Sequence, residues 1–185
     1  MASRINADSS NGLQLVSDSS GEIQFQSSGI TKATLNSSGL SSPGHVLQVV
    51  HSSLSTQVTS SSSTQVTTGL EATITPSSTS SKILIMLTLP HCYKSNASSS
   101  NAIRFELRKN DVYPSMQVIS QFVGYTGSAG VMYFSVGYNH YDSPSTTSAT
   151  KYTLYFANNN NGADVRINAN TGGVASTITL MEIAG

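Results

Sequence analysis

Short alternating stretches, separated by turn-forming segments, run from residue 46 to the end of the chain and constrain its fold more than any other feature. Apolar and polar residues largely alternate in them, as in half-buried β-strands. No window of a dozen residues combines helical apolar spacing with good helix formers. The pattern predicts an all-β sandwich or jelly roll. We expect about eleven strands, near residues 46–51, 55–60, 64–68, 71–75, 82–89, 102–109, 116–125, 130–138, 150–156, 163–169 and 176–183.

The beginning of the chain has a different organisation. Ser-Ser-Gly occurs at residues 19–21, 27–29 and 37–39, with short alternating runs between the triplets. Each triplet predicts a turn, because Gly adopts positive φ without steric cost. Strands of four or five residues cannot bury an apolar face alone, so they need another chain or surface. A β-stem or docking arm fits this pattern, and a flexible Ser/Gly linker is the alternative. The candidate docking or stem interface consists of Leu13, Leu15, Ile23, Phe25, Ile30 and Leu35.

The clearest boundary in the sequence is the run Ser-Ser-Pro-Gly at residues 41–44. Pro followed by Gly marks a turn, and a long apolar-containing strand starts directly after it, at Val46. We therefore expect residues 1–43 to form an N-terminal β-arm used for docking and trimerisation. Residues 44–185 would form a jelly-roll knob.

Two stretches depart from simple alternation. Residues 83–87 are apolar on both faces, and residues 131–134 nearly so. A strand that is apolar on both sides must be covered on both sides, here by a loop or by a neighbouring subunit. The chain has 8 Tyr against 5 Phe and no Trp, and Tyr is enriched at protein interfaces. The candidate subunit interface in the knob consists of Tyr133, Tyr152, Tyr155 and Phe156.

Composition excludes several classes of function. Ser and Thr supply 54 of the 185 residues (35 Ser plus 19 Thr), and only 10% are charged, with a net charge of zero. Such a chain has no electrostatic footprint for nucleic acid. It lacks an apolar run long enough to cross a membrane, and its first ten residues do not resemble a signal peptide. A single Cys excludes an internal disulfide and a multi-cysteine metal site.

No segment of the chain predicts catalysis, a cofactor or a metal. Residues 140–143, His-Tyr-Asp-Ser, contain the residue types of a catalytic triad, but on one short loop, whereas triad members come from separate segments. The 4 His residues are scattered along the chain. The Asn-rich run at 158–162 favours a hairpin turn over a calcium site. Arg104, Glu106 and Arg108 share one strand face and predict a self-neutralised ladder.

Four blocks of the sequence resemble, in their joint order, segments of structural proteins of tailed bacteriophages. The resemblance covers most of residues 44–185, and the blocks that carry it are Val46–Val50, GLEATITPSSTSSKILIML at 69–87, DSPSTTSATKYTLYF at 142–156 and STITLMEIAG at 176–185. The Ser-Ser-Gly strands resemble the stem repeats of phage fibres. The resemblance implies a knob similar to tumour-necrosis-factor and complement C1q-like domains, homotrimeric and carried on a phage particle. It transfers no residue roles, because the family has no fixed receptor-contact motif.

These observations together predict a non-enzymatic structural protein on the virion surface. We expect a homotrimer, such as a capsid decoration (cement) protein or head fibre, docked by its N-terminal arm with the knob facing outward. Its partners would be itself, other virion proteins such as the major capsid protein, and a host surface glycan, but neither nucleic acid nor membrane. The alternative is a receptor-binding tail fibre or tail-tip protein mediating host adsorption. A virion-borne glycan hydrolase is a third hypothesis and requires two converging acids.

Overall fold

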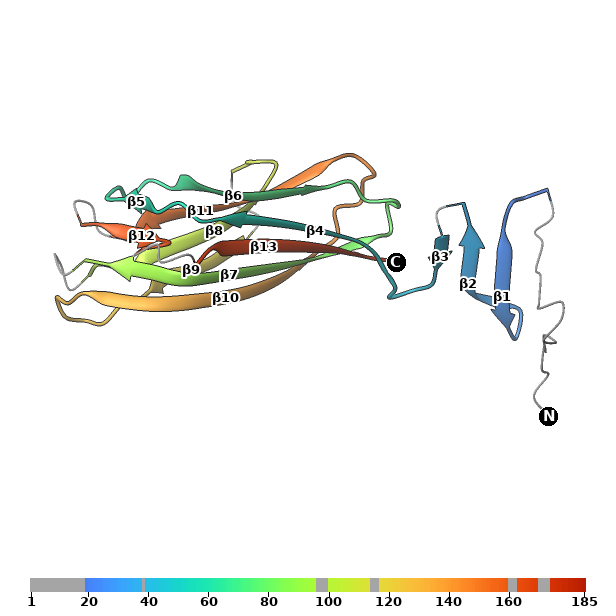
Figure 1. Ribbon diagram of the computed structural model, residues 1–185, viewed down its shortest axis with the longest axis horizontal. Helices are drawn as coiled ribbons and strands as arrows, with labels where there is room; N and C mark the ends of the chain where they lie inside the picture. Colours follow the sequence, from blue (N-terminus) through green and yellow to red (C-terminus); the bar gives the residue numbers. More distant parts are fainter. Residues whose placement is uncertain (1–18, 38, 96–99, 114–116, 160–162, 170–173) are drawn as a thin grey trace. The chain divides into compact units, whose positions relative to one another are not determined.

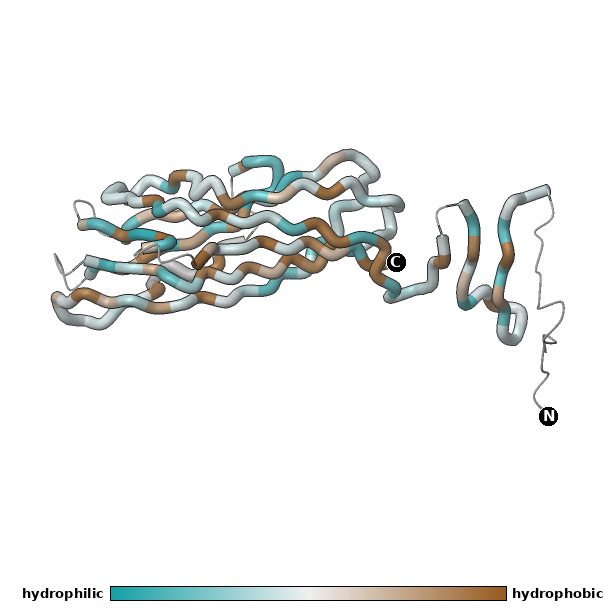
Figure 2. Tube along the Cα trace, viewed as in Figure 1, coloured by the Kyte–Doolittle hydropathy of each residue, from teal (hydrophilic) through white to brown (hydrophobic). Residues whose placement is uncertain are grey.

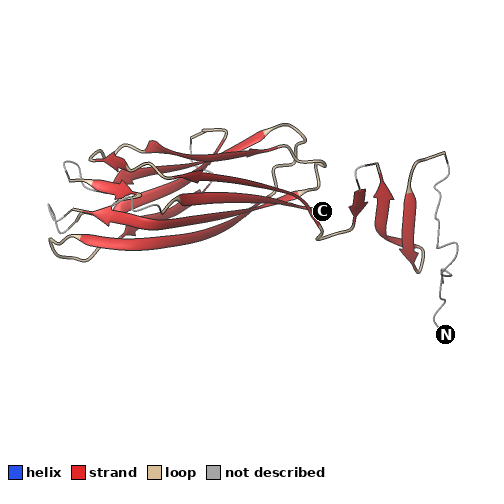
Figure 3. Ribbon diagram, in the orientation of Figure 1, coloured by secondary structure: helices blue, strands red, loops and turns tan. Residues whose placement is uncertain are grey.

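The computed structural model is all-β in the residues that it describes, which are 19–37, 39–95, 100–113, 117–159, 163–169 and 174–185 (Figure 1 and Figure 3). Among these residues there is no helix that could cross a membrane. The chain divides into two compact units, Met1–His45 and Val46–Gly185. The boundary predicted from the sequence, after residue 43, lies two residues earlier.

The first unit contains a three-stranded antiparallel sheet, which we call the N-terminal sheet. Its strands, in spatial order, are β1 (Ile23–Ser27), β2 (Ile30–Asn36) and β3 (Gly39–Ser41). Ser28 and Gly29 join β1 to β2 with φ values of 53° and 74°. Positive φ at both central residues is the geometry of a type I′ hairpin turn. This confirms the turn predicted from the Ser-Ser-Gly triplet at 27–29.

A β-bulge sets which side chains share a face of the N-terminal sheet. Phe25 pairs with Ala33 but Gln26 pairs with Thr31, so Lys32 is an extra residue without a partner in the β1–β2 ladder. Because side chains alternate between faces, the extra residue changes the phase of β2 by one position. Ile30 therefore lies on the same face as Phe25 instead of the opposite one.

The second unit is a sandwich of two antiparallel sheets. The larger sheet contains β4 (Val46–Leu54), β13 (Ser176–Ile183), β7 (Lys82–Lys94), β12 (Val165–Ile167) and β5 (Val58–Ser60) in that order, with β10 (Met132–Asp142) also paired to β7. The smaller sheet has the order β6 (Val66–Ile74), β11 (Thr150–Asn158), β8 (Ile103–Lys109) and β9 (Gln117–Val123). Figure 1 shows the two sheets stacked face to face.

The core lies between the two sheets and comes from the alternation seen in the sequence. In β13, for example, side chains switch regularly between buried and half-buried. Fully buried side chains from both sheets form one cluster, which includes Leu70, Ile83, Ile85, Leu89, Phe105, Leu107, Tyr152, Leu154, Phe156, Ile178 and Leu180. An alternating strand gives each sheet one core face and one outer face.

The predicted strands at 64–68 and 71–75 are one continuous strand, β6. The ladder shifts register here, since Thr153 pairs with Glu71 but Tyr155 pairs with Thr67. Gly69 lies in this irregularity with a φ of 79°, a conformation that Gly adopts without strain. The gap between the two predicted strands is thus a bulge inside one strand.

Candidate functional site

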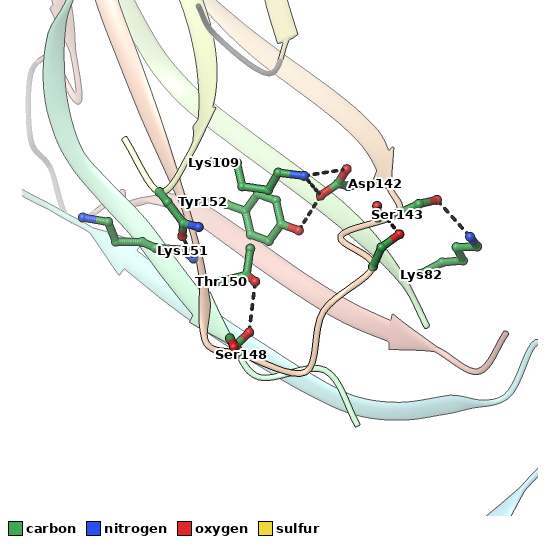
Figure 4. Close-up of polar contacts among 10 residues, drawn as sticks. Lys82, Lys109, Asp142, Ser143, Ser148, Thr150, Lys151 and Tyr152 are labelled. Carbon is green, nitrogen blue, oxygen red and sulfur yellow. Dashed lines mark hydrogen bonds and ion pairs between the residues drawn. The ribbon is translucent and has the colours of Figure 1, made fainter. Parts of the chain in front are cut away.

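A polar cluster around Asp142 connects the two sheets at one end of the sandwich (Figure 4). The Tyr152 hydroxyl donates to Asp142 Oδ2 at 2.8 Å, and Lys109 Nζ lies 3.0 Å from the same oxygen. Burial raises the pKa of Tyr152, and the hydrogen bond to Asp142 raises it further. The cluster joins β10 of the larger sheet to β8 and β11 of the smaller one. Asp142 is therefore engaged in holding the sandwich together, which fits a structural role for residues 140–143.

Glu182 is fully buried near the same end of the sandwich and is held by hydrogen bonds. The hydroxyls of Ser77 and Ser81 donate to its Oε1 at 2.7 and 2.6 Å, and Gln48 Nε2 donates to Oε2 at 2.5 Å. Burial alone would raise the pKa of Glu182, but the hydrogen bonds from Ser81, Gln48 and Ser77 outweigh it and lower the pKa. The carboxylate anchors the Ser77–Ser81 turn to β13.

Cys92 is a further reactive group in the sandwich core. Its thiol is fully buried, and burial raises its pKa to about 12. A thiol in that environment is a poor nucleophile, because the thiolate is the reactive form. Among the described residues, no group of three or more His, Cys, Asp or Glu side chains converges as a metal site would require.

The N-terminal sheet has one apolar face, which we call the arm face. Cross-strand partners share a face, so the register places Ile23, Leu35 and Leu40 in one row. Phe25 pairs with Ala33 in the next row, and Ile30 follows beyond the bulge. The opposite face is polar, with Gln26 Nε2 and Thr31 Oγ1 each donating to Gln24 Oε1 at 3.1 Å.

The arm face is exposed in the single chain. The exposed fractions of Phe25, Ile30, Leu35 and Leu40 are 45%, 58%, 40% and 50%. Four of the residues predicted for the docking interface, Ile23, Phe25, Ile30 and Leu35, thus lie on one face, whereas Leu13 and Leu15 lie outside the described residues. Sequence reasoning missed Leu40, although its place directly after the third Ser-Ser-Gly repeats the pattern of Ile30.

The outer face of the larger sheet carries a second apolar surface. Val49, Met181, Leu84 and Tyr141 pair in succession across four strands and form what we call the apolar row. Val49 is 54% exposed and Tyr141 56% exposed, while Met181 and Leu84 are half-buried. Figure 2 shows hydrophobic residues gathered where β4 begins beside the end of β13. Leu84 lies in the predicted doubly apolar stretch at 83–87, so that stretch does present an apolar side chain on the outer face.

The outer face of the smaller sheet is occupied by charged side chains, and we call it the charged face. Arg108 Nη2 lies 3.1 Å from Glu106 Oε2, and Arg104 lies 4.0 Å from Oε1 of the same carboxylate. Lys151 Nζ contacts Asp111 at 2.6 Å and Glu71 at 3.4 Å. The hydrogen bond from Lys151 lowers the pKa of Asp111. The predicted ladder of Arg104, Glu106 and Arg108 is confirmed, but Glu106 is less exposed than a solvated face implies, at 8% of its side chain.

The four residues predicted for the subunit interface of the knob occupy three different environments. Tyr152 and Phe156 are fully buried in the core of one chain, so they have no surface left for a neighbour and that prediction is corrected for both. Their aromatic run alternates between core and outside, and these two point inward. Tyr155 lies on the charged face beneath Arg108, whose guanidinium carbon is 4.0 Å from its ring centre. Tyr133 is 59% exposed on the outer face of the larger sheet.

Comparison with known proteins adds no assignment. No family model matches the chain, and no curated protein matches it significantly. The candidate surfaces therefore rest on the geometry described above.

Proposed function

We propose that the protein is a non-enzymatic structural component of a tailed-phage particle, a homotrimeric surface appendage of the decoration or head-fibre type. The arm face docks it on the particle, and the sandwich faces outward. The observation that carries the proposal is the arm face itself. A three-stranded sheet with four apolar side chains each at least 40% exposed gains its stability only when another surface covers that face.

The strand order of the sandwich supports a jelly-roll knob. Apart from the short strands β5 and β12, the larger sheet has the order β4-β13-β7-β10 and the smaller one β6-β11-β8-β9. In chain order among these eight strands, the sheets read 1-8-3-6 and 2-7-4-5, which is the arrangement of two interlocked Greek keys. This order agrees with the knob that the resemblance to phage proteins implies.

The apolar row supports contact between copies of the chain. Its members are uncharged residue types, and the row on one side of it adds Thr179, Met86 and Asn139, whereas the row on the other side holds Lys82. Three copies of an uncharged row can meet around an axis without the desolvation penalty of buried ions. A contact through the charged face would bury ions, because the ion pairs of that face are already formed within one chain. The apolar row is therefore the contact surface of the proposed trimer.

Two neighbouring residues of β2 test the docking role. Leu35 belongs to the arm face and Thr34 to the polar face. Leu35→Glu should reduce incorporation into particles about tenfold or more, because docking would bury an unpaired carboxylate. Thr34→Glu places the same charge one residue away and should be incorporated as the wild type is. Equal incorporation of both variants, measured on purified particles, would contradict docking through this face.

The site of incorporation distinguishes the proposal from its alternative, a receptor-binding tail protein. Gold label against the protein should be dispersed over the heads of intact particles in the electron microscope. Label confined to the tail would favour the adsorption role instead. Light scattering of the purified protein should give the mass of a trimer, and a stable monomer would remove that part of the proposal.

A further inference from the structure

A second row on the outer face of the larger sheet differs in chemistry from the apolar row. Tyr133, Tyr93, Arg166 and Thr59 pair in succession across β10, β7, β12 and β5, and we call them the tip row. The row lies at the end of β7 opposite Lys82. Lys82 pairs with Ile183, which also pairs with Val46, where the chain enters the sandwich. At the rise of a β-strand, the eleven residue steps from Lys82 to Tyr93 separate the two ends by roughly 35 Å.

The side chains of the tip row form a platform in which two tyrosine rings and a guanidinium group lie next to one another. The ring centres of Tyr93 and Tyr133 are 5.1 Å apart, with an angle of 57° between their planes. The guanidinium carbon of Arg166 lies 4.7 Å from the centre of the Tyr93 ring. Arg166 Nη2 also contacts Asp164 Oδ2 at 3.1 Å. Tyr133 remains 59% exposed despite these neighbours, so one face of the platform is open to solvent.

We infer that the tip row binds the pyranose rings of a neutral saccharide. A sugar ring presents C–H groups on one face, which pack on an exposed aromatic ring, and hydroxyls at its edge, which need donors and acceptors. Tyr133 and Tyr93 supply the rings. Arg166 and Asp164, whose side chains are 32% and 44% exposed, supply a donor and an acceptor side by side for two adjacent hydroxyls. Three strand spacings separate Tyr133 from Thr59, so the row extends under a short oligosaccharide.

The charged pair argues against a second copy of the chain as the occupant of the tip row. Burying Arg166 and Asp164 under a protein surface would cost their desolvation, which one surface ion pair does not recover. Saccharide hydroxyls replace the lost water contacts with hydrogen bonds of the same kind. The apolar row, which has no charge to desolvate, meets the requirement of a protein contact instead. The inference uses the proposed function only to explain why this end of the sandwich would be free to meet a saccharide.

Two exposed tyrosines provide a matched test. Tyr133 and Tyr113 are 59% and 74% exposed, but only Tyr133 belongs to the tip row, and Tyr113 lies in neither row of the larger sheet. The full-length protein is mixed with the methyl glycosides of glucose, galactose and mannose at millimolar concentration, and binding is followed by saturation-transfer NMR. At least one glycoside should receive signal at its ring protons. Tyr133→Ala should weaken that binding about fivefold, the loss expected for one aromatic contact, whereas Tyr113→Ala should not change it.

A second variant of the tip row and a folding control complete the test of saccharide binding. Arg166→Gln should also weaken binding, and circular dichroism should confirm that each variant is folded. Absence of signal from all three glycosides overturns the inference, as does equal binding by Tyr133→Ala and the wild type. Signal from N-acetylneuraminic acid alone would overturn the choice of a neutral saccharide. None of these results depends on where the protein lies on a particle, so a failure here is distinguishable from a failure of the proposed function.

Discussion

The outer faces of the two sheets of the sandwich carry different kinds of side chain. In each sheet, every second residue of a strand points away from the core. The smaller sheet covers its outer face with ion pairs of its own, such as Arg108 with Glu106 at 3.1 Å. The larger sheet leaves Val49 and Tyr141 more than half exposed. The side chains of the charged face find their partners within a single chain, whereas the apolar row leaves apolar side chains exposed. The few charges of the chain are therefore distributed unevenly between the two faces.

The largest expected effect comes from placing one charge on each face. Met181→Lys adds an ammonium to the apolar row, where association would bury it without a partner. We expect association between copies to weaken at least a hundredfold, or about 3 kcal/mol. Thr73→Lys places the same group on the outer side of β6 and should leave association unchanged. Sedimentation equilibrium measures both, and equal behaviour of the two variants would remove the distinction between the faces.

Removing the central carboxylate of the charged face should affect folding and leave association intact. Glu106→Ala leaves Arg104 and Arg108 without their acid, in a place where the Arg108 side chain is only 12% exposed. We expect the free energy of unfolding to fall by about 2 kcal/mol. Urea denaturation followed by circular dichroism measures this change. A loss of association at unchanged stability would mean that the charged face is the contact surface instead.

The interior carboxylate Glu182 provides a reference that belongs to neither face. Its pKa in the folded protein is below the usual 4.5. Its stabilising contribution is therefore complete above that pH and is lost as the pH falls further, through the lowered pKa. Glu182→Gln should cost about 1 kcal/mol at neutral pH and should lose less stability than the wild type on acidification. Urea midpoints compared at neutral and acid pH test this, and parallel losses in the two proteins would contradict it.

The smallest effect is expected at the edge of the charged face. Arg104 lies 4.0 Å from Glu106 with 31% of its side chain exposed. Arg104→Met should lower stability by about 0.5 kcal/mol or less, as for a screened surface pair. Raising the salt concentration should reduce the difference from the wild type further. A cost as large as that of Glu106→Ala would show that the ladder acts as one cooperative unit.

The alternation of side chains predicted the strands far better than it predicted the surfaces. The last predicted strand, 176–183, coincides with β13, because a half-buried strand shows its period directly in the sequence. Aromatic composition places Tyr152 and Phe156 at an interface, because it does not reveal which phase of β11 points inward. Tyr93 and Arg166 lie on strands far apart in the sequence, so no local pattern could place them in one row. The place of Leu40 on the arm face could have been predicted, since Leu40 repeats the position of Ile30 after a Ser-Ser-Gly triplet.

The burial of Cys92 allows its thiol to be used as an internal probe of opening of the sandwich core. The chain has 1 cysteine, and that thiol is completely enclosed in the core. A thiol-specific reagent therefore reacts only during moments when the core opens, and its rate reports how often that happens. The labelling rate can be followed in crude mixtures or on a large assembly, where optical unfolding curves fail. Opening kinetics of the free and the assembled protein can thus be compared without adding a probe.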